Sequence, residues 1–466
     1  MIGKSVPRVD AYEKVTGRAK FTDDLILNKC LVARVYHAKI GNGVVKFIDT
    51  SEAEALDGVV KVVTFKDVPN HCYPTPGHPW SVELAHQDVA DRNLLTGRVR
   101  YYGDDIAAVV AEDEVTASRA LKLIKVEYEE YPVVVSPKIS MRGTEHPIHL
   151  DKKDNILARS SFAIGDVDSA MEKAAVKLKR SYKTPIVQHC HIENNISYAY
   201  MEKGRVVVVS STQIPHIVRR IVGQALGIPW GQVRVIKPYV GGGFGNKQEV
   251  LYEPLDAFLT MQVGGRPVKI ELTREETFTN TRTRHSIEYD MEAGVDAEGH
   301  LLAKEMTTYS NQGAYASHGH AIAANGLTAS RLQYACPNIR GEAYTVYTNC
   351  PTAGAMRGYG IPQVCFATES FMDDIAYEIG MDPLEFRRKN LIHGYYEDAY
   401  LKPIAANTNG IFECLEKGAE YIHWDEKRKA YQNQTGDIRR GVGMALFSYK
   451  TGVWPISLDR KSTRLN

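Results

Sequence analysis

The chain lacks the paired cysteines that mark a zinc ribbon, an iron–sulfur cluster or a disulfide framework. Its 466 residues include seven cysteines at wide spacing, and none of them forms a C-x-x-C pair. An odd number of widely spaced cysteines favours free thiols in a cytoplasmic protein. Because the sequence offers no cluster or structural zinc ligands, any redox chemistry must use a cofactor held by other groups.

Long apolar runs and an excess of one charge are also missing. No stretch of about 18 apolar residues predicts a membrane-spanning helix, and the first residues lack the apolar core of a secretory signal. The formal net charge is +1, so the composition favours neither a nucleic acid nor an acidic membrane as partner. The length predicts about three domains, and 44% hydrophobic residues are typical of globular cores.

The first third of the chain mixes strands and helices. Residues 106–110 are an apolar run that predicts a strand, and Asp113 suits the N-cap of a following helix. Apolar residues then recur at the spacing of one helix face, at Ala117, Ala120, Leu121 and Ile124. Residues 125–131 predict another strand. Residues 136–161 contain proline and glycine without a sustained period, which predicts a linker.

From about Phe162 onward the pattern predicts strands that alternate with single helices. Residues 206–210 form a β-branched strand, and Pro215 fits the first turn of the next helix, where its missing N–H costs nothing. Gly227 fits the end of that helix. Residues 233–237 predict the strand that leads into the most unusual segment of the chain.

That segment is the glycine-rich sequence of residues 241–247, between a predicted strand and a predicted helix. Glycines there let backbone N–H groups approach a ligand closely. The spacing fits neither a P-loop, because no Ser or Thr follows Lys247, nor the dinucleotide fingerprint. A simple tight turn remains an alternative. Phe244 is unexpected in a glycine run, since an aromatic ring there packs on a flat group or wedges a loop.

Two further segments offer polar groups next to small residues or at a strand end. Residues 353–360 surround Arg357 with small neighbours, and its guanidinium offers a fixed fork of donors to an anionic or carbonyl-bearing group. A solvated surface arginine is the alternative. Gln213 follows a strand and precedes a helix, where ligands collect in α/β sheets. A solvent-facing glutamine after a Ser/Thr cap is the alternative there.

Residues 188–193 suggest a metal site because they contain two histidines and a cysteine. Strand alternation would place His189 and His191 on one face and Cys190 on the other. No second ligand cluster at zinc spacing follows. We therefore favour a structural or supporting role for these histidines.

Taken together and in this order, the segments resemble the molybdenum-binding subunits of bacterial xanthine dehydrogenases, within the xanthine oxidase/aldehyde oxidase family. The matching segments are residues 8–24, 187–193, 211–213, 241–249 and 352–363. The resemblance extends to about Leu458. It implies an α+β fold with an α/β hammerhead domain followed by molybdopterin-binding domains. The predicted divisions are an entry segment 1–16, a hammerhead domain 17–135, a linker 136–161, a first molybdopterin domain 162–380, the start of a second 381–459, and a non-native tail 460–466.

The resemblance also implies a cofactor and a division of labour. The cofactor is molybdenum bound to molybdopterin in its cytosine dinucleotide form, and the [2Fe-2S] clusters and FAD lie on partner subunits. The implied reaction hydroxylates a purine, hypoxanthine or xanthine, with water as the oxygen source, and electrons leave through the partners. The implied residues near the metal and cofactor are Gln213, Gly242, Gly243, Phe244, Gly245 and Arg357. Arg357 would also stabilise negative charge on the substrate, and the metal has no direct protein ligand.

Two departures from the family pattern stand out. The general-base glutamate of the family lies far toward the C-terminus and has no counterpart here, so we expect a truncated chain that is inactive by itself. Gln248 stands where animal enzymes have a purine-binding glutamate, and it would contact substrate without carrying charge.

Three alternatives remain open. One is a sister hydroxylase that acts on an aldehyde, nicotinate or another N-heterocycle. Among such sister enzymes a carbon monoxide dehydrogenase fits less well, because Gly358 follows Arg357 where those relatives have cysteine. The others are a non-catalytic cofactor-binding or assembly fragment and a nucleotide-binding module at the glycine-rich segment. Molybdenum content separates these last two from the enzyme.

Overall fold

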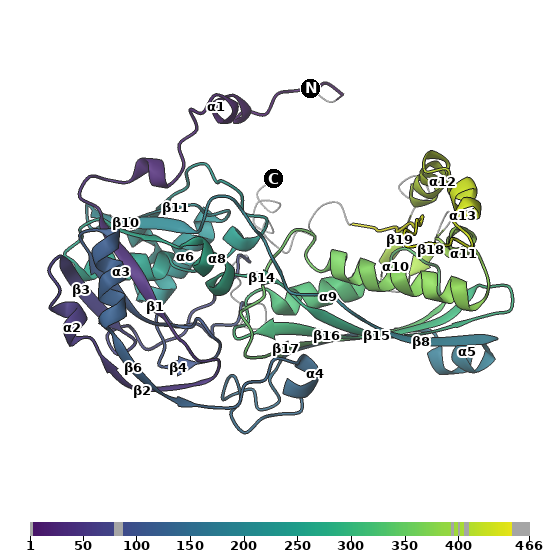
Figure 1. The fold of residues 1–466 in the computed structure, drawn as a ribbon, viewed down its shortest axis with the longest axis horizontal. Coiled ribbons are helices and arrows are strands. Elements are labelled where there is room, and N and C mark those ends of the chain that lie inside the picture. Colours follow the sequence, from purple (N-terminus) through teal and green to yellow (C-terminus); the bar gives the residue numbers. More distant parts are fainter. Residues whose placement is uncertain (1–2, 79–86, 393–395, 399–400, 405–409, 450–466) are drawn as a thin grey trace, which may run out of the picture.

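Two large sheets organise the chain. The computed structural model describes residues 3–78, 87–392, 396–398, 401–404 and 410–449, and of residues 396–404 it describes the backbone alone. A seven-stranded sheet has the order β12-β11-β10-β13-β1-β5-β3, and a five-stranded sheet has the order β7-β17-β16-β15-β8 (Figure 1). In the view of Figure 1 the two sheets lie side by side, with the chain crossing between them near β14.

The seven-stranded sheet joins the predicted hammerhead domain to the predicted cofactor domain. Its strands are β1 (Leu31–His37), β3 (Val59–Thr64), β5 (Asp105–Ala111), β10 (Ile196–Glu202), β11 (Arg205–Ser210), β12 (Val233–Ile236) and β13 (Val268–Glu271). β1 pairs with β13 in parallel, with Leu31 opposite Val268. Apolar residues of both regions pack into one core. The two regions therefore cannot separate without breaking a continuous sheet.

The helices of this half form on amphipathic or capped segments. They are α2 (Ser51–Glu54), α3 (Glu114–Leu123), α6 (Pro215–Leu226) and α7 (Glu253–Gln262). The Asp113 side chain accepts a hydrogen bond from the Thr116 N–H, which confirms the predicted cap of α3. Pro215 opens α6, and Gly227 ends it with a left-handed φ of 66°. A smaller sheet of order β4-β2-β6 completes this half, from β2 (Gly43–Asp49), β4 (Arg98–Val99) and β6 (Lys125–Glu130).

The five-stranded sheet differs from the predicted alternation of strands and helices. Its strands are β7 (Ile156–Ile164), β8 (Val176–Lys183), β15 (Ile287–Val295), β16 (Leu301–Gly313) and β17 (Asn338–Tyr347). β15 and β16 follow each other as an antiparallel hairpin, with Met291 opposite Met306 and no helix between them. Alternate residues of β15 are buried, so the period of two was the correct signal here. Helices α9 (Gly319–Ala329) and α10 (Ile361–Glu378) cover one face (Figure 1).

The remaining elements are short or peripheral. Within the described ranges they are α1 (Ala11–Val15), α4 (Pro137–Ser140), α5 (Val167–Lys173), β9 (Val187–Gln188), α8 (Arg274–Asn280), β14 (Thr283–Arg284), α11 (Pro383–Asn390), β18 (Tyr396–Asp398), β19 (Leu401–Ile404), α12 (Ile411–Tyr421) and α13 (Trp424–Ala430), and they include the short 3-10 turns Asp23–Leu25, Trp230–Gln232 and Asn246–Gln248. Among the described residues, no helix combines the length and apolar character needed to cross a bilayer.

The α+β class and the order of the two regions are confirmed. The predicted linker contains α4, and β7 begins at Ile156, before the predicted boundary. Leu384 and Phe386 of α11 pack into the same core as α10, so this core continues past residue 380. The strand expected at residues 452–458 and the tail 460–466 lie outside the described residues.

His37 connects the hammerhead region, which is the predicted domain of residues 17–135, to α8 of the cofactor region, which is the predicted domain of residues 162–380. Its Nδ1 lies 2.9 Å from Oδ1 of Asp105, and its Nε2 lies 3.7 Å from Oε1 of Glu276. Burial lowers the pKa of His37, but the carboxylates of Asp105 and Glu276 outweigh that effect and raise it to about 9. Burial raises the pKa of Glu276, but hydrogen bonds from His37 and the Thr273 N–H lower it to about 2.

These pKa shifts predict that the contact of His37 with Asp105 and Glu276 stabilises the fold in a pH-dependent way. The raised pKa of His37 contributes stability that is fully present below its unfolded value near 6.5 and is lost as the pH rises through about 9. Over that window the wild type should lose up to about 3 kcal/mol of unfolding free energy that His37→Gln does not lose. Urea denaturation at pH 6.5 and pH 9 measures the difference. The exposed His300 provides the control variant His300→Gln, whose unfolding free energy should change with pH as in the wild type. If the unfolding free energy of His37→Gln also changes with pH as in the wild type, His37 does not cause the pH dependence.

Candidate functional site

The glycine loop, residues 241–248, connects β12 to α7 as a tight turn. The Asn246 N–H donates to the Gly243 carbonyl at 2.9 Å, and the Gln248 N–H donates to the Gly245 carbonyl at 3.0 Å. Gly242, Phe244 and Gly245 have positive φ angles of 100°, 52° and 107°. A left-handed phenylalanine is uncommon, which indicates that the surrounding structure imposes the conformation of this loop.

Neighbouring segments pack directly on the glycines. A Cβ on Gly243 would lie 2.4 Å from Oε1 of Gln213, and a Cβ on Gly245 would lie 2.4 Å from the Ala355 carbonyl oxygen. These positions therefore need glycine because of close approach as well as turn geometry. The tight-turn reading of this segment was correct but incomplete, because the turn is also a junction between three loops.

Gln213 is held at this junction through one end of its amide. Its Oε1 accepts a hydrogen bond from the Gly245 N–H at 3.1 Å, and its backbone N–H donates to the Lys247 carbonyl at 2.8 Å. Since the oxygen end faces a donor, the NH₂ end is the one left to donate outward. The Gln213 residue is exposed, so this donor reaches the open side of the loop.

The arginine loop, residues 352–360, lies against the same turn. The Arg357 N–H donates to the Phe244 carbonyl at 2.9 Å, and the Arg357 carbonyl accepts from Nη2 of Arg284 at 2.7 Å. Gly358, Tyr359 and Gly360 all have positive φ before α10 begins. Arg357 is exposed, and no described side chain pairs with its guanidinium. The structure thus places the Arg357 backbone against Phe244, and Gln213 contacts the same glycine loop through Gly245.

A buried ion pair supports the glycine loop from below. Nζ of Lys247 lies 2.6 Å from Oε2 of Glu193, and the same carboxylate oxygen accepts from the Gly241 N–H at 2.7 Å. Burial lowers the pKa of the Lys247 ammonium, and the Glu193 carboxylate opposes that shift. Sequence reasoning missed this pair because its members are far apart in the chain and neither has a local signal.

His189 and His191 have supporting positions on the buried side, opposite Cys190 as predicted, although the segment is not a strand. β9 ends at Gln188, and Cys190 has a positive φ of 54°, so the residues leave the strand before the alternation begins. Both histidines are buried and Cys190 is exposed. Nε2 of His189 lies 2.7 Å from the Ala355 carbonyl, and Nε2 of His191 accepts from the Asn246 amide at 3.0 Å. The histidines therefore brace the two loops.

A second buried pair anchors the end of the glycine loop. Nε of Arg282 lies 2.5 Å from Oε2 of Glu249, and Thr75 of the hammerhead region donates to the same oxygen at 3.1 Å. Burial raises the pKa of Glu249, but Arg282 outweighs it and the pKa is lowered. A Cβ on Gly354 would lie 2.2 Å from Oε1 of Glu249, so the arginine loop packs on this pair.

Gln248 lies on the side of the glycine loop that faces the hammerhead region. A Cβ on Gly77 would lie 3.2 Å from Cγ of Gln248, and the Gln248 carbonyl lies 3.4 Å from Nε2 of His318. The side chain is half-buried. Gln248 is thus close to the junction, on the side where Gly77 packs against the loop.

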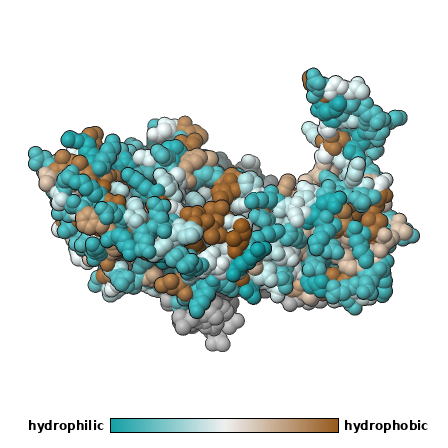
Figure 2. Space-filling view, turned by 60° about the horizontal axis from the view of Figure 1, so that its bottom comes forward, coloured by the Kyte–Doolittle hydropathy of each residue, from teal (hydrophilic) through white to brown (hydrophobic). Residues whose placement is uncertain are grey.

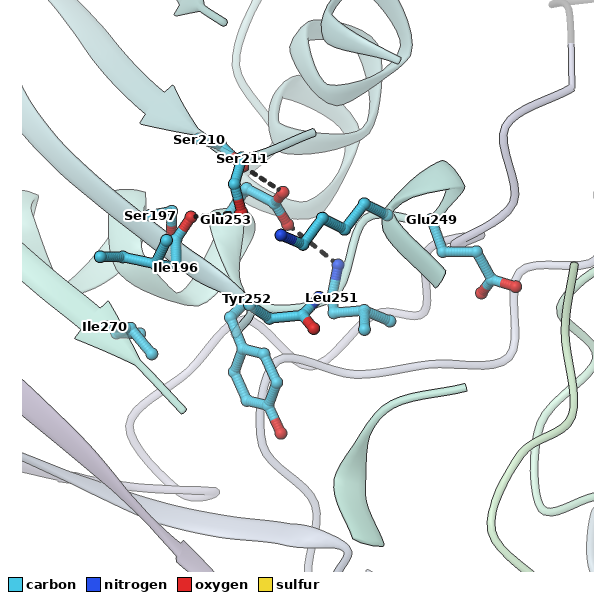
Figure 3. Close-up of a pocket in the computed structure, with 11 residues that line it drawn as sticks. Ile196, Ser197, Ser210, Ser211, Glu249, Leu251, Tyr252, Glu253 and Ile270 are labelled. Carbon is cyan, nitrogen blue, oxygen red and sulfur yellow. Dashed lines mark hydrogen bonds between the residues drawn. The ribbon is translucent and has the colours of Figure 1, made fainter. Parts of the chain in front are cut away.

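A small cavity next to Lys247 is lined by residues of β10, β11, β13 and the start of α7, and not by Gln213, Phe244 or Arg357 (Figure 3). Its volume of about 10 Å³ holds no more than a single water molecule. Ser210 donates to Oε1 of Glu253 at 2.7 Å, and the Leu251 N–H donates to Oε2 at 3.0 Å, so this carboxyl is satisfied by the protein. The cavity is too small for a cofactor, so a cofactor held by the glycine loop would have to lie on the open side of that loop.

Two family models match the chain. The molybdopterin cofactor-binding domain matches residues 148–391, and the aldehyde oxidase and xanthine dehydrogenase a/b hammerhead domain matches residues 16–132.

Similar proteins are also found among curated sequences and solved structures. The chain is 46% identical to a xanthine dehydrogenase molybdenum-binding subunit of Escherichia coli O157:H7, over 98% of this chain and 61% of that protein. It is 32% identical to the nicotinate dehydrogenase large molybdopterin subunit of Eubacterium barkeri, over 90% of this chain and 96% of that protein. The aldehyde oxidoreductase of Desulfovibrio gigas superposes with a TM-score of 0.81 at 29% identity, over 93% of this chain and 48% of that chain.

The close packing at Gly245 predicts an unequal effect of alanine substitutions. Gly245→Ala and Gly204→Ala both force a left-handed alanine, but a Cβ meets nothing within 4 Å at Gly204 and meets the Ala355 backbone at 2.4 Å at Gly245. Both variants should lose about 1–2 kcal/mol to backbone strain. Gly245→Ala should lose a further 1–3 kcal/mol or so through overpacking. Urea unfolding of both variants measures these two losses of stability. Equal losses would show that the Ala355 backbone moves away from the added Cβ at no cost.

Proposed function

Because the chain belongs to the aldehyde oxidase and xanthine dehydrogenase family of molybdopterin-binding proteins, we propose that its glycine and arginine loops hold a molybdenum cofactor. The observation that carries the proposal is the convergence of a glycine turn, the Gln213 amide and the Arg357 guanidinium on one open surface. Oxygen-rich groups need such donors, and a flat ring system needs the close approach that glycine permits. When bound, the cofactor supplies two-electron oxidation with water as the oxygen source.

Each residue of the junction has a distinct proposed task. The Gln213 NH₂ group donates to an oxygen at the metal centre, because the Gly245 N–H fixes its other end. Gly242, Gly243 and Gly245 keep the surface free of side chains, so that the cofactor can approach the backbone. Phe244 is about half exposed and offers an apolar wall beside this surface. The protein thus contributes orientation and electrostatics, and the cofactor contributes the redox chemistry.

Arg357 is the residue that we assign to the substrate. A fixed cation next to the reacting ring stabilises negative charge that develops during attack on a purine, which is electrostatic catalysis. Its backbone is fixed through both N–H and carbonyl, whereas its guanidinium has no described partner. Gln248 is a further substrate contact in this proposal. Because it lies next to Gly77, it would contact the substrate from the side of the hammerhead region.

The whole enzyme is a larger assembly in this proposal. The chain spans about 60% of the length of the xanthine dehydrogenase subunits to which it is similar. We assign the assembly the oxidation of hypoxanthine or xanthine, with the cofactor in its cytosine dinucleotide form and with electrons leaving through [2Fe-2S] and FAD subunits. A hydrophobic patch near the middle of one face (Figure 2) supports a partner contact, since such patches mark protein interfaces. Seven free cysteines support a cytoplasmic location.

A sister reaction on another N-heterocycle or an aldehyde is the second candidate. The names of two similar proteins favour it, because one is a nicotinate dehydrogenase subunit and the other an aldehyde oxidoreductase. Both candidates share the fold and the cofactor, so they differ only in the substrate that Arg357 and its surroundings accept.

Molybdenum content tests the cofactor proposal. The chain, extended at its C-terminus to the length of its xanthine dehydrogenase relatives and co-expressed with its neighbouring subunits, should contain about one molybdenum per copy by mass spectrometry, because the junction offers donors that nothing described satisfies. Xanthine-dependent dye reduction is measured on the same sample, with nicotinate and an aldehyde in parallel. Molybdenum with xanthine turnover supports the first candidate, and molybdenum with turnover of another substrate supports the second. A protein without molybdenum would instead be a non-catalytic binding or assembly protein.

Arg357→Met tests the substrate role in the assembled enzyme. We expect purine turnover to fall by about 10²–10³-fold, the usual effect of removing one stabilising donor, while molybdenum content stays constant. Arg159→Met is the control, because Arg159 is an exposed surface cation far along the chain in β7. Unchanged purine kinetics in Arg357→Met would exclude the role, and loss of molybdenum would assign Arg357 to cofactor retention instead.

A further inference from the structure

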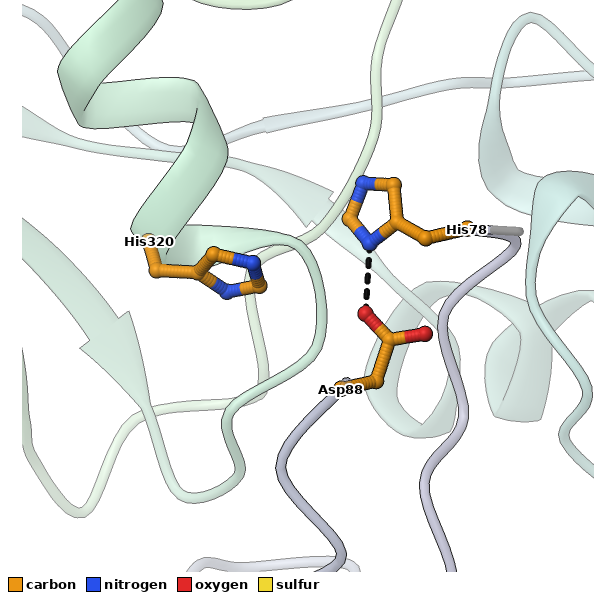
Figure 4. Close-up of side chains that lie close together, drawn as sticks. All are labelled: His78, Asp88 and His320. Carbon is orange, nitrogen blue, oxygen red and sulfur yellow. Dashed lines mark hydrogen bonds and ion pairs between the residues drawn. The ribbon is translucent and has the colours of Figure 1, made fainter. Parts of the chain in front are cut away.

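Three metal-ligating side chains from two parts of the chain meet next to the site. His78 and Asp88 lie on the hammerhead segment, and His320 lies in the first turn of α9 (Figure 4). One ligand atom from each residue lies within 4.8 Å of the others. Figure 4 shows the two imidazole rings and the carboxylate turned toward a common space. The cluster is thus formed only when the hammerhead segment packs on the second sheet region.

The polar groups of this cluster are incompletely satisfied by the protein. Nδ1 of His78 lies 2.5 Å from Oδ1 of Asp88, whose side chain is almost fully buried. The other carboxylate oxygen faces Nη2 of Arg220 at 3.7 Å. Nδ1 of His320 is buried and makes no hydrogen bond with any described group. Because an unsatisfied buried polar atom costs about 1–3 kcal/mol, this nitrogen indicates a ligand that the protein itself does not supply.

A second layer of contacts fixes the orientation of His78. Its Nε2 lies 3.0 Å from Nδ1 of His318 and 3.1 Å from the hydroxyl oxygen of Tyr359. The Gly77 N–H donates to Nε2 of His318 at 3.2 Å, so Nδ1 of His318 carries its proton. The Tyr359 hydroxyl oxygen lies 2.8 Å from that Nδ1 and can accept from it and from Nε2 of His78, which leaves Nδ1 of His78 free to bind a metal. Metal-bound histidines in proteins have this feature, since they donate their second ring N–H to an acceptor, which fixes the tautomer and leaves the first nitrogen for the metal.

We propose that His78, Asp88 and His320 bind a divalent transition-metal ion of the zinc type. Two imidazoles and one carboxylate suit zinc, whereas magnesium and calcium prefer oxygen ligands alone. Small side-chain rotations bring the ligand atoms to the metal–ligand distance of about 2.0–2.2 Å. The fourth position stays open to water, because His78 and His320 are only partly buried.

The ion would join three segments that local sequence does not connect. It would hold the hammerhead segment on the start of α9, and through His78 it would reach Tyr359 of the arginine loop. Tyr359 is two residues from Arg357, so a bound ion stabilises the loop that carries the proposed substrate cation. The metal site needs no molybdopterin, and it can exist whether or not the cofactor proposal is correct.

Metal titration of the full chain tests the site. The purified protein is freed of metal with a chelator and then titrated with Zn²⁺ by calorimetry, and with Co²⁺ by visible absorption. We expect one equivalent to bind and the melting temperature to rise, because an ion that binds the folded state alone stabilises it. Asp88→Asn and His320→Ala should each weaken this binding at least about 10-fold.

Two matched variants keep the test decisive. His300→Ala removes a histidine that pairs with Asp296 at 3.0 Å on the protein surface, and it should leave the binding unchanged. His320→Cys supplies another zinc ligand at the same place and should restore binding that His320→Ala loses. Circular dichroism confirms that each variant is folded, and molybdenum content measured in parallel reports separately on the cofactor proposal.

Two results would overturn the site. Absence of Zn²⁺ and Co²⁺ binding in the folded wild type would reduce the cluster to an ordinary Asp–His hydrogen bond. Binding that persists undiminished in both Asp88→Asn and His320→Ala would place the ion elsewhere.

Discussion

The buried ion pair between Lys247 and Glu193 is the constraint on which the candidate site depends. Nζ of Lys247 is almost inaccessible and touches both the side chain and the backbone carbonyl of Glu193. Breaking such a pair leaves an uncompensated buried charge at a cost of about 3–5 kcal/mol. The same carboxylate holds the Gly241 N–H, so the pair sets where the glycine loop begins. The positions of Gln213 and Arg357 follow from that loop, because both hydrogen-bond to it.

The site lies where the seven-stranded and five-stranded sheets meet. Gln213 and the glycine loop follow β11 and β12, two parallel strands whose carboxyl ends share one edge of the sheet. Ligands collect at such edges, because the loops there leave the sheet together. The second sheet region contributes the arginine loop, and the hammerhead region contributes Thr75 and Gly77 from its side. A surface made from three regions keeps its geometry only if all of them pack together, and the pairing of β1 with β13 joins two of these regions in one sheet.

The sequence predicted what depends on neighbours along the chain. The caps of α3 and α6, the strand β11 and the glycine turn all follow from local spacing, and the structure has them where expected. The ion pairs Lys247–Glu193 and Arg282–Glu249 could not be predicted, because their members lie 54 and 33 residues apart and each residue alone looks like an ordinary surface charge. Cys190 shows a different limit, since the predicted alternation of burial holds there although a left-handed residue keeps the segment from forming a strand. The task of each site residue was supplied by family resemblance, and the geometry alone would not have given it.

The charged side chains around the arginine loop differ from those in the interior in whether an acidic partner compensates their charge. Lys247 and Arg282 are buried, and each faces a carboxylate that compensates its charge. Arg284 is partly buried next to Arg357, and burial lowers its pKa without an acidic partner to oppose the shift. Its described partners are the Arg357 carbonyl and the Gln363 amide oxygen, which are neutral.

The Arg284 guanidinium is therefore desolvated beside the Arg357 backbone, with no described carboxylate paired to it. Desolvating Arg284 in this way costs free energy that neutral acceptors only partly recover. An anionic or oxygen-rich ligand on the open side would offset that cost, and it would do so without disturbing the compensated pairs beneath. The uncompensated charge is therefore best understood as part of a binding surface whose electrostatics are completed by the ligand rather than by the protein.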